Sequence, residues 1–98
     1  IGAEELGHIL MRAFIKTIKD LDEKPEKIIF INSGVKLSCK GSKVIEDLKE
    51  LEKSGIKILS CGTCLDFYGL KEDLAAGTIS NMYEILSALQ DAEKVIRP

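Results

Sequence analysis

Two cysteines of this chain, Cys61 and Cys64, are separated by two small residues in a Cys-Gly-Thr-Cys segment. A cysteine reacts as its thiolate, and because a free thiol ionises near a pKa of about 8.5, a reactive one needs surroundings that lower this value. The start of a helix does so, since unpaired backbone N–H groups and the helix dipole favour negative charge. Gly62 allows a tight turn, Thr63 is small, and Lys36 in another loop is a cation that would add to the effect. The segment predicts a pair of reactive thiols.

Metal binding is one chemistry that such a pair supports. A structural zinc site has four nitrogen or sulfur ligands, and Cys39 and His8 would complete the set. His8, however, shares a helical face with Arg12, which is typical of a solvated or interface histidine. An iron–sulfur cluster requires a fourth cysteine, whereas the chain has 3. We therefore expect neither a metal nor another cofactor.

Thiol chemistry without a metal leaves three alternatives. A thioredoxin-type catalyst places a proline opposite its C-x-x-C motif, and the prolines here, Pro25 and Pro98, lie upstream and at the last position. Reversible oxidation of Cys61 and Cys64 needs no such proline and stays open. Sulfur carriage also stays open, in which a low-pKa cysteine accepts sulfur as a persulfide and passes it to the next thiol. In the third alternative the two thiols are half buried and only pack.

The composition places these thiols in one globular domain that covers residues 1–98. It is 45% hydrophobic and 31% charged, with a formal net charge of -2. Such a balance, with 5% aromatic residues, supports neither phosphate binding along a nucleic acid nor base stacking, and no apolar run approaches the length of a membrane span. An odd set of cysteines without a secretory signal favours the reducing cytoplasm. We expect a cytoplasmic domain that binds neither nucleic acid nor membrane.

Hydrophobic periodicity predicts alternating helices and strands. Helices are expected over 4–21, 42–54 and around 79–89, the second capped by Ser42 and the third by Asn81 with Glu84. Strands are expected over 28–31, over 56–59 directly before Cys61, and over 94–97, with short helical turns in an irregular stretch at 65–74. This order indicates right-handed crossovers and an α/β fold with a parallel sheet. Because such a chain normally opens on a strand, we also expect a first strand upstream of Ile1.

The first helix is apolar over more than one face. Met11 and Ile15 lie outside its main stripe, which is formed by Leu6, Ile9, Leu10, Ala13, Phe14, Ile18 and Leu21. A helix this broadly apolar is usually buried on two sides. We therefore expect Met11 and Ile15 to meet a second copy of the chain.

Ligands and reactive groups of a parallel sheet gather beyond the carboxyl ends of its strands. The loops at 1–3, 32–41 and 61–64 would open at this edge, which therefore holds all three cysteines. The edge is the expected site.

The remaining residues of this edge have expected roles of their own. Asn32, Ser33 and Gly34 would shape the turn after a strand and line the floor of a pocket, with Gly34 in a backbone conformation that other residues avoid. Asp66 would cap the short helix after the motif. Cys39 is expected to be an incidental loop thiol that could face Cys61.

Several segments resemble the DsrE/DsrF-like sulfur-relay family, and most closely the C-terminal domain of the YedF-type selenium-metabolism proteins. The segments are 4–7, 31–37 and 60–70, and 81–84 is similar too. The resemblance covers essentially the whole chain and is most specific around the Cys-Gly-Thr-Cys segment.

This resemblance implies a three-layer α/β/α fold with a parallel sheet, a preceding strand, and homo-oligomers such as trimers or hexamers. In the sulfur-relay members a persulfide cysteine stands eight residues before a glycine, and the same offset from Gly69 reaches Cys61. Cys64 has no counterpart in them, so its part as a resolving thiol is our inference. The partners implied are sulfur donor and acceptor proteins, among them a TusA-like carrier domain.

The prediction is therefore a sulfur-relay or sulfurtransferase-like domain that carries a persulfide, of sulfur or of selenium, on Cys61 with help from Cys64. Two alternatives remain. One is a thiol–disulfide redox module that uses the same two cysteines. The other is a non-enzymatic oligomeric binding domain, based on the broad apolar surface of the first helix.

Overall fold

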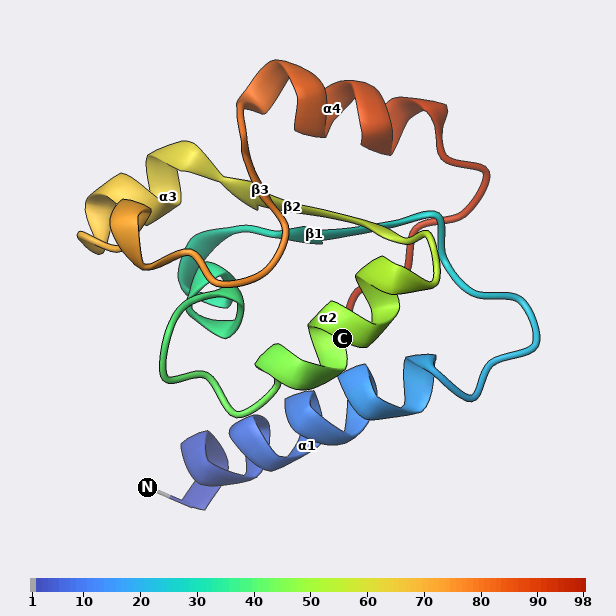
Figure 1. Ribbon diagram of the computed structural model, residues 1–98, viewed down its shortest axis with the longest axis horizontal. Helices are drawn as coiled ribbons and strands as arrows, with labels where there is room; N and C mark the ends of the chain where they lie inside the picture. Colours follow the sequence, from blue (N-terminus) through green and yellow to red (C-terminus); the bar gives the residue numbers. More distant parts are fainter. Residues whose placement is uncertain (1) are drawn as a thin grey trace.

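Three parallel strands, in the order β1-β2-β3, form the centre of the molecule. The computed structural model describes residues 2–98, with side chains from Glu4 onward. The strands are β1 (Lys27–Phe30), β2 (Lys57–Cys61) and β3 (Thr78–Ser80), and the helices are α1 (Gly2–Ile18), α2 (Ile45–Lys53), α3 (Gly62–Phe67) and α4 (Met82–Asp91). Two 3-10 helices, η1 (Asn32–Ser38) and η2 (Lys71–Asp73), follow β1 and α3. Figure 1 shows α4 on one face of the sheet and α1 with α2 on the other, which confirms the α/β fold.

The central strand β2 carries the reactive segment at its end. Its residues 58–61 are all buried, because β1 and β3 flank it and helices cover both faces. Ile28 of β1 lies beside Ile58, and Thr78 of β3 lies beside Leu59. A strand covered on both faces carries apolar side chains on both, as Ile58 and Leu59 do in β2.

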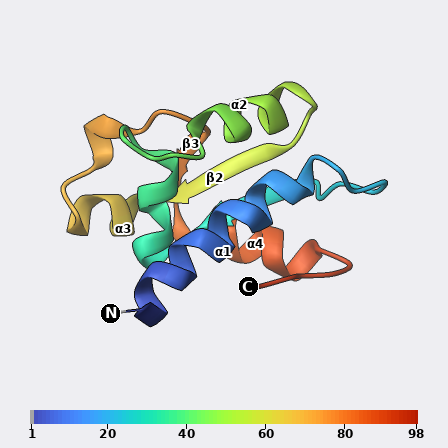
Figure 2. The same ribbon diagram turned by 90° about the horizontal axis from the view of Figure 1, so that it is seen from below.

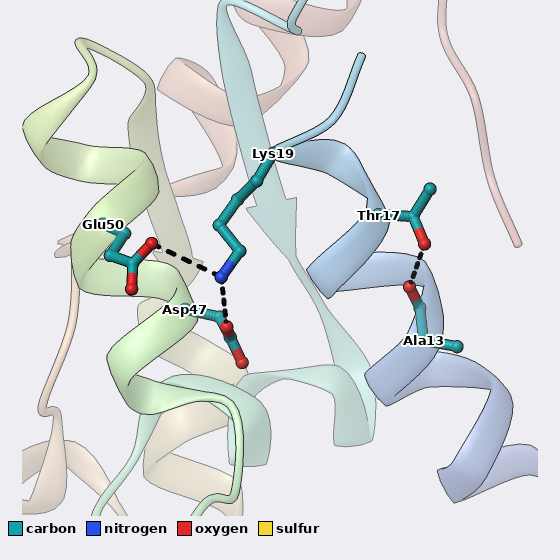
Figure 3. Close-up of polar contacts among 5 residues, drawn as sticks. All are labelled: Ala13, Thr17, Lys19, Asp47 and Glu50. Atoms are coloured by element: carbon teal, nitrogen blue, oxygen red, sulfur yellow. Dashed lines mark hydrogen bonds and ion pairs between the residues drawn. The ribbon is translucent and has the colours of Figure 1, made fainter.

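Helices α1 and α2 are joined by an ion pair as well as by apolar packing. The Lys19 ammonium, just after α1, lies 2.7 Å from Asp47 and 3.4 Å from Glu50 of α2, as Figure 3 shows. Within α1, the Thr17 hydroxyl donates to the Ala13 carbonyl oxygen at 2.7 Å. The carboxylates raise the pKa of Lys19, chiefly through the Asp47 hydrogen bond. These contacts orient α1 along α2 (Figure 2).

The predicted orientation of α1 is wrong. Ile15 is 2% exposed and belongs to the core, and Met11 packs against that core. Most of the stripe expected to face inward is instead exposed, with Leu10 58% exposed, and Ile18 is the one member that lies in the core. Both faces of this helix are apolar, so periodicity alone does not decide which one packs against α2 and the sheet. The remaining open members of the stripe are Leu6, Ile9, Phe14 and Leu21.

The third strand also differs from the prediction. It is the three-residue β3 at Thr78–Ser80, whereas residues 94–97 form no strand. Val95 and Ile96 are exposed and pair with no strand among the residues described. The β-branched residues of that segment resemble a strand in sequence, but a strand requires a neighbour to receive its backbone hydrogen bonds.

The sequence signals predict the cap of α4 correctly but place the start of α2 too early. The Asn81 side chain accepts a hydrogen bond from the Glu84 N–H at 2.8 Å, which confirms the expected cap of α4. Helix α2 begins at Ile45 rather than at residue 42, and Ser42 accepts instead from the Val44 N–H, ahead of the helix. The short helical turns expected at 65–74 are the end of α3 and η2.

The described part of the chain contains no helix with the length and apolar character needed to cross a membrane. The loop expected at 1–3 is helical from Gly2 onward. The strand expected upstream of Ile1 lies outside the described residues and stays a prediction.

Candidate functional site

Cys61 stands where the central strand ends and a helix begins. It is the last residue of β2 and the N-cap residue of α3, with φ -62° and ψ 121°. This extended backbone directs the chain straight from the strand into the helical turn, so the N–H groups of Thr63 and Cys64 hydrogen-bond the Cys61 sulfur. The side chain is 2% exposed. A thiol is therefore held inside the sheet edge among backbone donors.

The surroundings of Cys61 favour its thiolate. Burial is the largest single influence and raises the pKa, but the N–H and thiol of Cys64, together with the Thr63 N–H, outweigh it. The pKa of Cys61 is thus lowered from its ordinary value. The expected contribution of Lys36 is not found, because only these hydrogen bonds lower the pKa.

Cys64 has the opposite character. It lies in the first turn of α3, is half-buried, and accepts a hydrogen bond from the Asn32 N–H at 3.1 Å on its sulfur. Burial, followed by its hydrogen bond to Cys61, raises its pKa despite the Asn32 donor. Of the two thiols, Cys61 therefore loses its proton more readily than Cys64.

Asn32 reaches Cys64 through an uncommon backbone conformation. Its φ is +52°, in the left-handed region that asparagine tolerates better than most residues. The expectation that Gly34 would occupy this conformation is wrong, because its φ is not positive and its N–H simply donates to the Ile31 carbonyl oxygen at 3.0 Å. Ser33 lies between them and is exposed. The turn thus delivers the Asn32 N–H to the Cys64 sulfur.

Gly62 is required by a close approach rather than by its backbone angles. A Cβ atom there would lie 3.0 Å from the Ser80 carbonyl oxygen and 3.2 Å from Cγ2 of Ile79. The start of α3 therefore packs directly against β3. Thr63 follows as an exposed residue, so the outer side of the motif faces solvent.

Asp66 and Cys39 do not take part in the thiol pair. Asp66 is wrongly predicted as a cap, because α3 begins four residues earlier and Asp66 instead pairs with Lys71 at 3.0 Å. Cys39 is 2% exposed and donates its S–H to the Val35 carbonyl oxygen at 3.3 Å. Burial raises the pKa of Cys39, so it remains a packed, protonated thiol. No three His, Cys, Asp or Glu side chains of the described residues gather in a metal-binding group, so the zinc set with His8 does not assemble.

Two buried serines that lie close to the Cys-Gly-Thr-Cys segment were not identified from the sequence. The hydroxyls of Ser38 and Ser60 lie 2.8 Å apart, both fully buried, and Ser38 also donates to the Val35 carbonyl oxygen at 2.9 Å. They join η1 to β2 one residue before Cys61. The available signal was Ser60 itself, a polar residue within an otherwise apolar strand.

A search of protein-family models gives the identity of the fold. The model of the DsrE/DsrF-like family matches residues 7–98, which is nearly the whole chain and includes both cysteines. No curated protein and no solved structure matched in the two other searches. The parallel α/β fold agrees with this assignment. The chain belongs to the DsrE/DsrF-like family.

Proposed function

We propose that this domain is a sulfur carrier that holds a persulfide on Cys61. The observation that carries the proposal is the pairing of a buried cysteine of lowered pKa with a second cysteine that donates to it. Membership of the DsrE/DsrF-like family supports a sulfur-relay domain that works with partner proteins. Selenium in place of sulfur would use the same thiolate.

The carriage step is an exchange at sulfur. The Cys61 thiolate attacks the outer sulfur of a donor persulfide R–S–SH, and the S–S bond to Cys61 forms as the donor's S–S bond breaks. The donor leaves as the thiolate R–S⁻, and the transferred sulfur keeps its hydrogen. No electrons are gained or lost overall. The proton on Cys64 and the N–H groups of α3 stabilise the negative charge on Cys61 before the exchange.

Loading followed by discharge tests the proposal. The protein is incubated with a donor persulfide, freed of donor, and then mixed with an acceptor thiol, with intact mass measured at each stage. We expect one added sulfur per chain after loading and its loss after the acceptor is added. A chain that never gains sulfur, or that gains it and never releases it, would contradict a carrier.

The pH dependence of thiol alkylation provides a second prediction. Replacing Cys64 by alanine removes a donor that lowers the Cys61 pKa, so this pKa should rise. Because the thiolate is the reacting form, the pH at which Cys61 alkylation reaches half its maximal rate should rise as well, and the rate at pH 7 should fall. Peptide mass spectrometry follows the modification at Cys61. Cys39→Ser is the control, since Cys39 has no part in stabilising Cys61, and an unchanged midpoint in Cys64→Ala would refute the role of Cys64.

The alternative redox module would use the same cysteines. A Cys61–Cys64 disulfide requires an oxidant, and its signature is a mass two hydrogens lighter with no added sulfur. The lowered pKa of Cys61 and the protonated Cys64 are also what thiol–disulfide exchange needs. Sulfur carriage is favoured because the family assignment points to it.

The partners that we propose are sulfur donors and acceptors, including a TusA-like carrier domain, and the reducing cytoplasm is the compartment that keeps these thiols free. We also propose that the domain forms homo-oligomers. The exposed stripe of α1 supports this, because monomers rarely leave so many neighbouring apolar side chains in water.

Self-association should therefore depend on that stripe. Leu10→Glu is expected to weaken it roughly 10-fold or more, since burial of a leucine contributes about 1.5–3 kcal/mol. Sedimentation at micromolar concentration measures the effect. Gln90→Glu, which adds the same charge at an exposed position of α4, should leave association unchanged. A parent protein that stays monomeric would contradict the prediction, as would equal association of the two variants.

A further inference from the structure

A groove of about 770 Å³ is lined by Cys39 and by neighbours of the thiol pair, although Cys61 and Cys64 do not line it themselves. Its walls come from the N-terminal half of α1, from η1, from the loop that follows η1, and from the residues directly after α3. Pockets that hold small molecules have volumes of about 300–1,000 Å³. The groove is therefore large enough for a ligand of tripeptide size.

The groove connects to the thiol pair through two elements. Tyr68 lines the groove, and its N–H donates to the Cys64 carbonyl oxygen at 3.2 Å, one helical turn after the motif. Lys36 also lines the groove and belongs to η1, whose first residue, Asn32, donates to the Cys64 sulfur. The Lys36 ammonium lies 4.6 Å from the centre of the Tyr68 ring, which joins the two walls. Two segments that line the groove therefore also contact Cys64.

Positive charge is concentrated in this groove although the whole chain has a net charge of -2. Four cationic side chains line it, whereas Glu5 is the single carboxylate of the lining. Within the described part of the chain, no ion pair neutralises any of the four, and the paired lysines lie elsewhere. Clefts lined by one sign of charge focus the field and attract the opposite charge. The cationic residues are Arg12, Lys36, Lys40 and Lys43, with His8 beside them.

The groove is not lined by charge alone. Leu37, Val44 and Leu70 contribute apolar surface between the cations. An inorganic anion would leave this surface in water, whereas an organic anion covers it while its charged groups meet the lysines and arginine. The lining therefore fits a small organic molecule with more than one negative group.

We propose that the groove binds a small organic anion with at least two carboxylates, and that this anion is the thiol compound that exchanges sulfur with the cysteine pair. The identification as a sulfur-exchanging thiol rests on the proposed function, whereas binding of the anion does not. The exchange is the one written above, with the anion as the R group of R–S–SH. The groove holds the carboxylates, and the sulfur end reaches the pair.

Reduced glutathione, a thiol with two carboxylates and one ammonium group, is the probe for binding, and its diester, which keeps the ammonium but has no carboxylate, is the comparison. The groove variant is Lys40→Gln with Lys43→Gln. The matched control is Lys49→Gln with Lys53→Gln, which removes the same charge from exposed positions of α2 outside the groove. Because all four lysines are exposed, both variants should fold like the parent, which circular dichroism checks.

Calorimetric titration should show that the parent and the α2 control bind glutathione equally. The groove variant should bind it roughly 10-fold more weakly, and the diester should bind the parent about as weakly as glutathione binds the groove variant. With glutathione persulfide as donor, the groove variant should raise the KM for sulfur uptake by a similar factor and leave kcat unchanged. Equal affinities in the parent, the groove variant and the control would overturn the proposal.

The two levels of the proposal fail in different ways. Binding of reduced glutathione requires no sulfur transfer, so a parent that binds it yet never gains sulfur keeps the anion site and refutes the carrier. A parent that gains sulfur with the same KM in all variants refutes the groove as the site of the sulfur donor and keeps the carrier.

Discussion

Replacing Cys61 by serine is expected to lower the rate of sulfur uptake at least about 100-fold, because a serine hydroxyl is not ionised at neutral pH and is a poor nucleophile. The backbone donors of α3 stay in place in this variant, so only the attacking atom changes. Serine is close in size to cysteine and its hydroxyl accepts the same N–H groups, which should preserve the fold. The rate is measured from the sulfane sulfur bound to the protein, which is released with cyanide and quantified colorimetrically.

The same substitution at Cys64 is expected to have a smaller effect. Cys64 keeps the proton that stabilises the Cys61 thiolate, and a shorter serine side chain would hold that hydrogen bond less well. We expect about a 10-fold slower uptake at pH 7, because the pKa of the attacking thiol rises and a smaller fraction of it is ionised. Cys39→Ser is the matched control and should take up sulfur at the parent rate. If Cys64→Ser lost more activity than Cys61→Ser, the assignment of the carrier would have to be reversed.

The largest effect on stability is expected for Gly77→Ala. Gly77 has φ +77° and lies directly before β3, and a Cβ atom there would come within 2.7 Å of both Cγ2 and the carbonyl oxygen of Ile58. The left-handed backbone costs an alanine about 1–2 kcal/mol, and forced overlap in a packed region adds about 1–3 kcal/mol. We expect a loss of about 3 kcal/mol in the free energy of unfolding, a large part of the 5–15 kcal/mol that holds a typical domain together.

Gly41 provides the control for this prediction. Its φ is +89°, but no atom lies within 4 Å of the position that a Cβ would take. Gly41→Ala should therefore lose only the backbone contribution of about 1–2 kcal/mol. Urea unfolding followed by circular dichroism compares the two variants. Equal losses would mean that the close approach of Gly77 to β2 is absent in solution.

Much of the site could be predicted from the sequence because its chemistry is local. The adjacency of a strand and a helix at Cys61 follows from the apolar run before it and the small residues after it. The helix-start position was therefore a sound basis for a lowered pKa, and the structure adds the Cys64 thiol as a further donor. The predicted influence of Lys36 required knowledge of where a flexible side chain lies, which the sequence does not contain.

The features that the sequence analysis predicted wrongly or missed all depend on tertiary contacts. Asn32 and Gly34 both suit a left-handed turn, and the one chosen is the residue whose N–H meets Cys64 across the fold. The open stripe of α1 was assigned to the core because both faces of that helix are apolar. The strand β3 has 3 residues, too few for a pattern, and only its pairing with β2 defines it. The groove was missed for the same reason, since its cations come from segments distant in sequence.

The location of the transferred sulfur tests the central claim most directly. Cys61 and Cys64 lie between Lys57 and Lys71, so one tryptic peptide contains both, and fragmentation between Gly62 and Thr63 separates them. The protein is loaded with one equivalent of donor persulfide, alkylated at once, and digested. We predict that the added sulfur is found on Cys61, both in the parent and in Cys64→Ser. An added sulfur on Cys64 alone, or no added sulfur on Cys61 in Cys64→Ser, would contradict a Cys61 carrier.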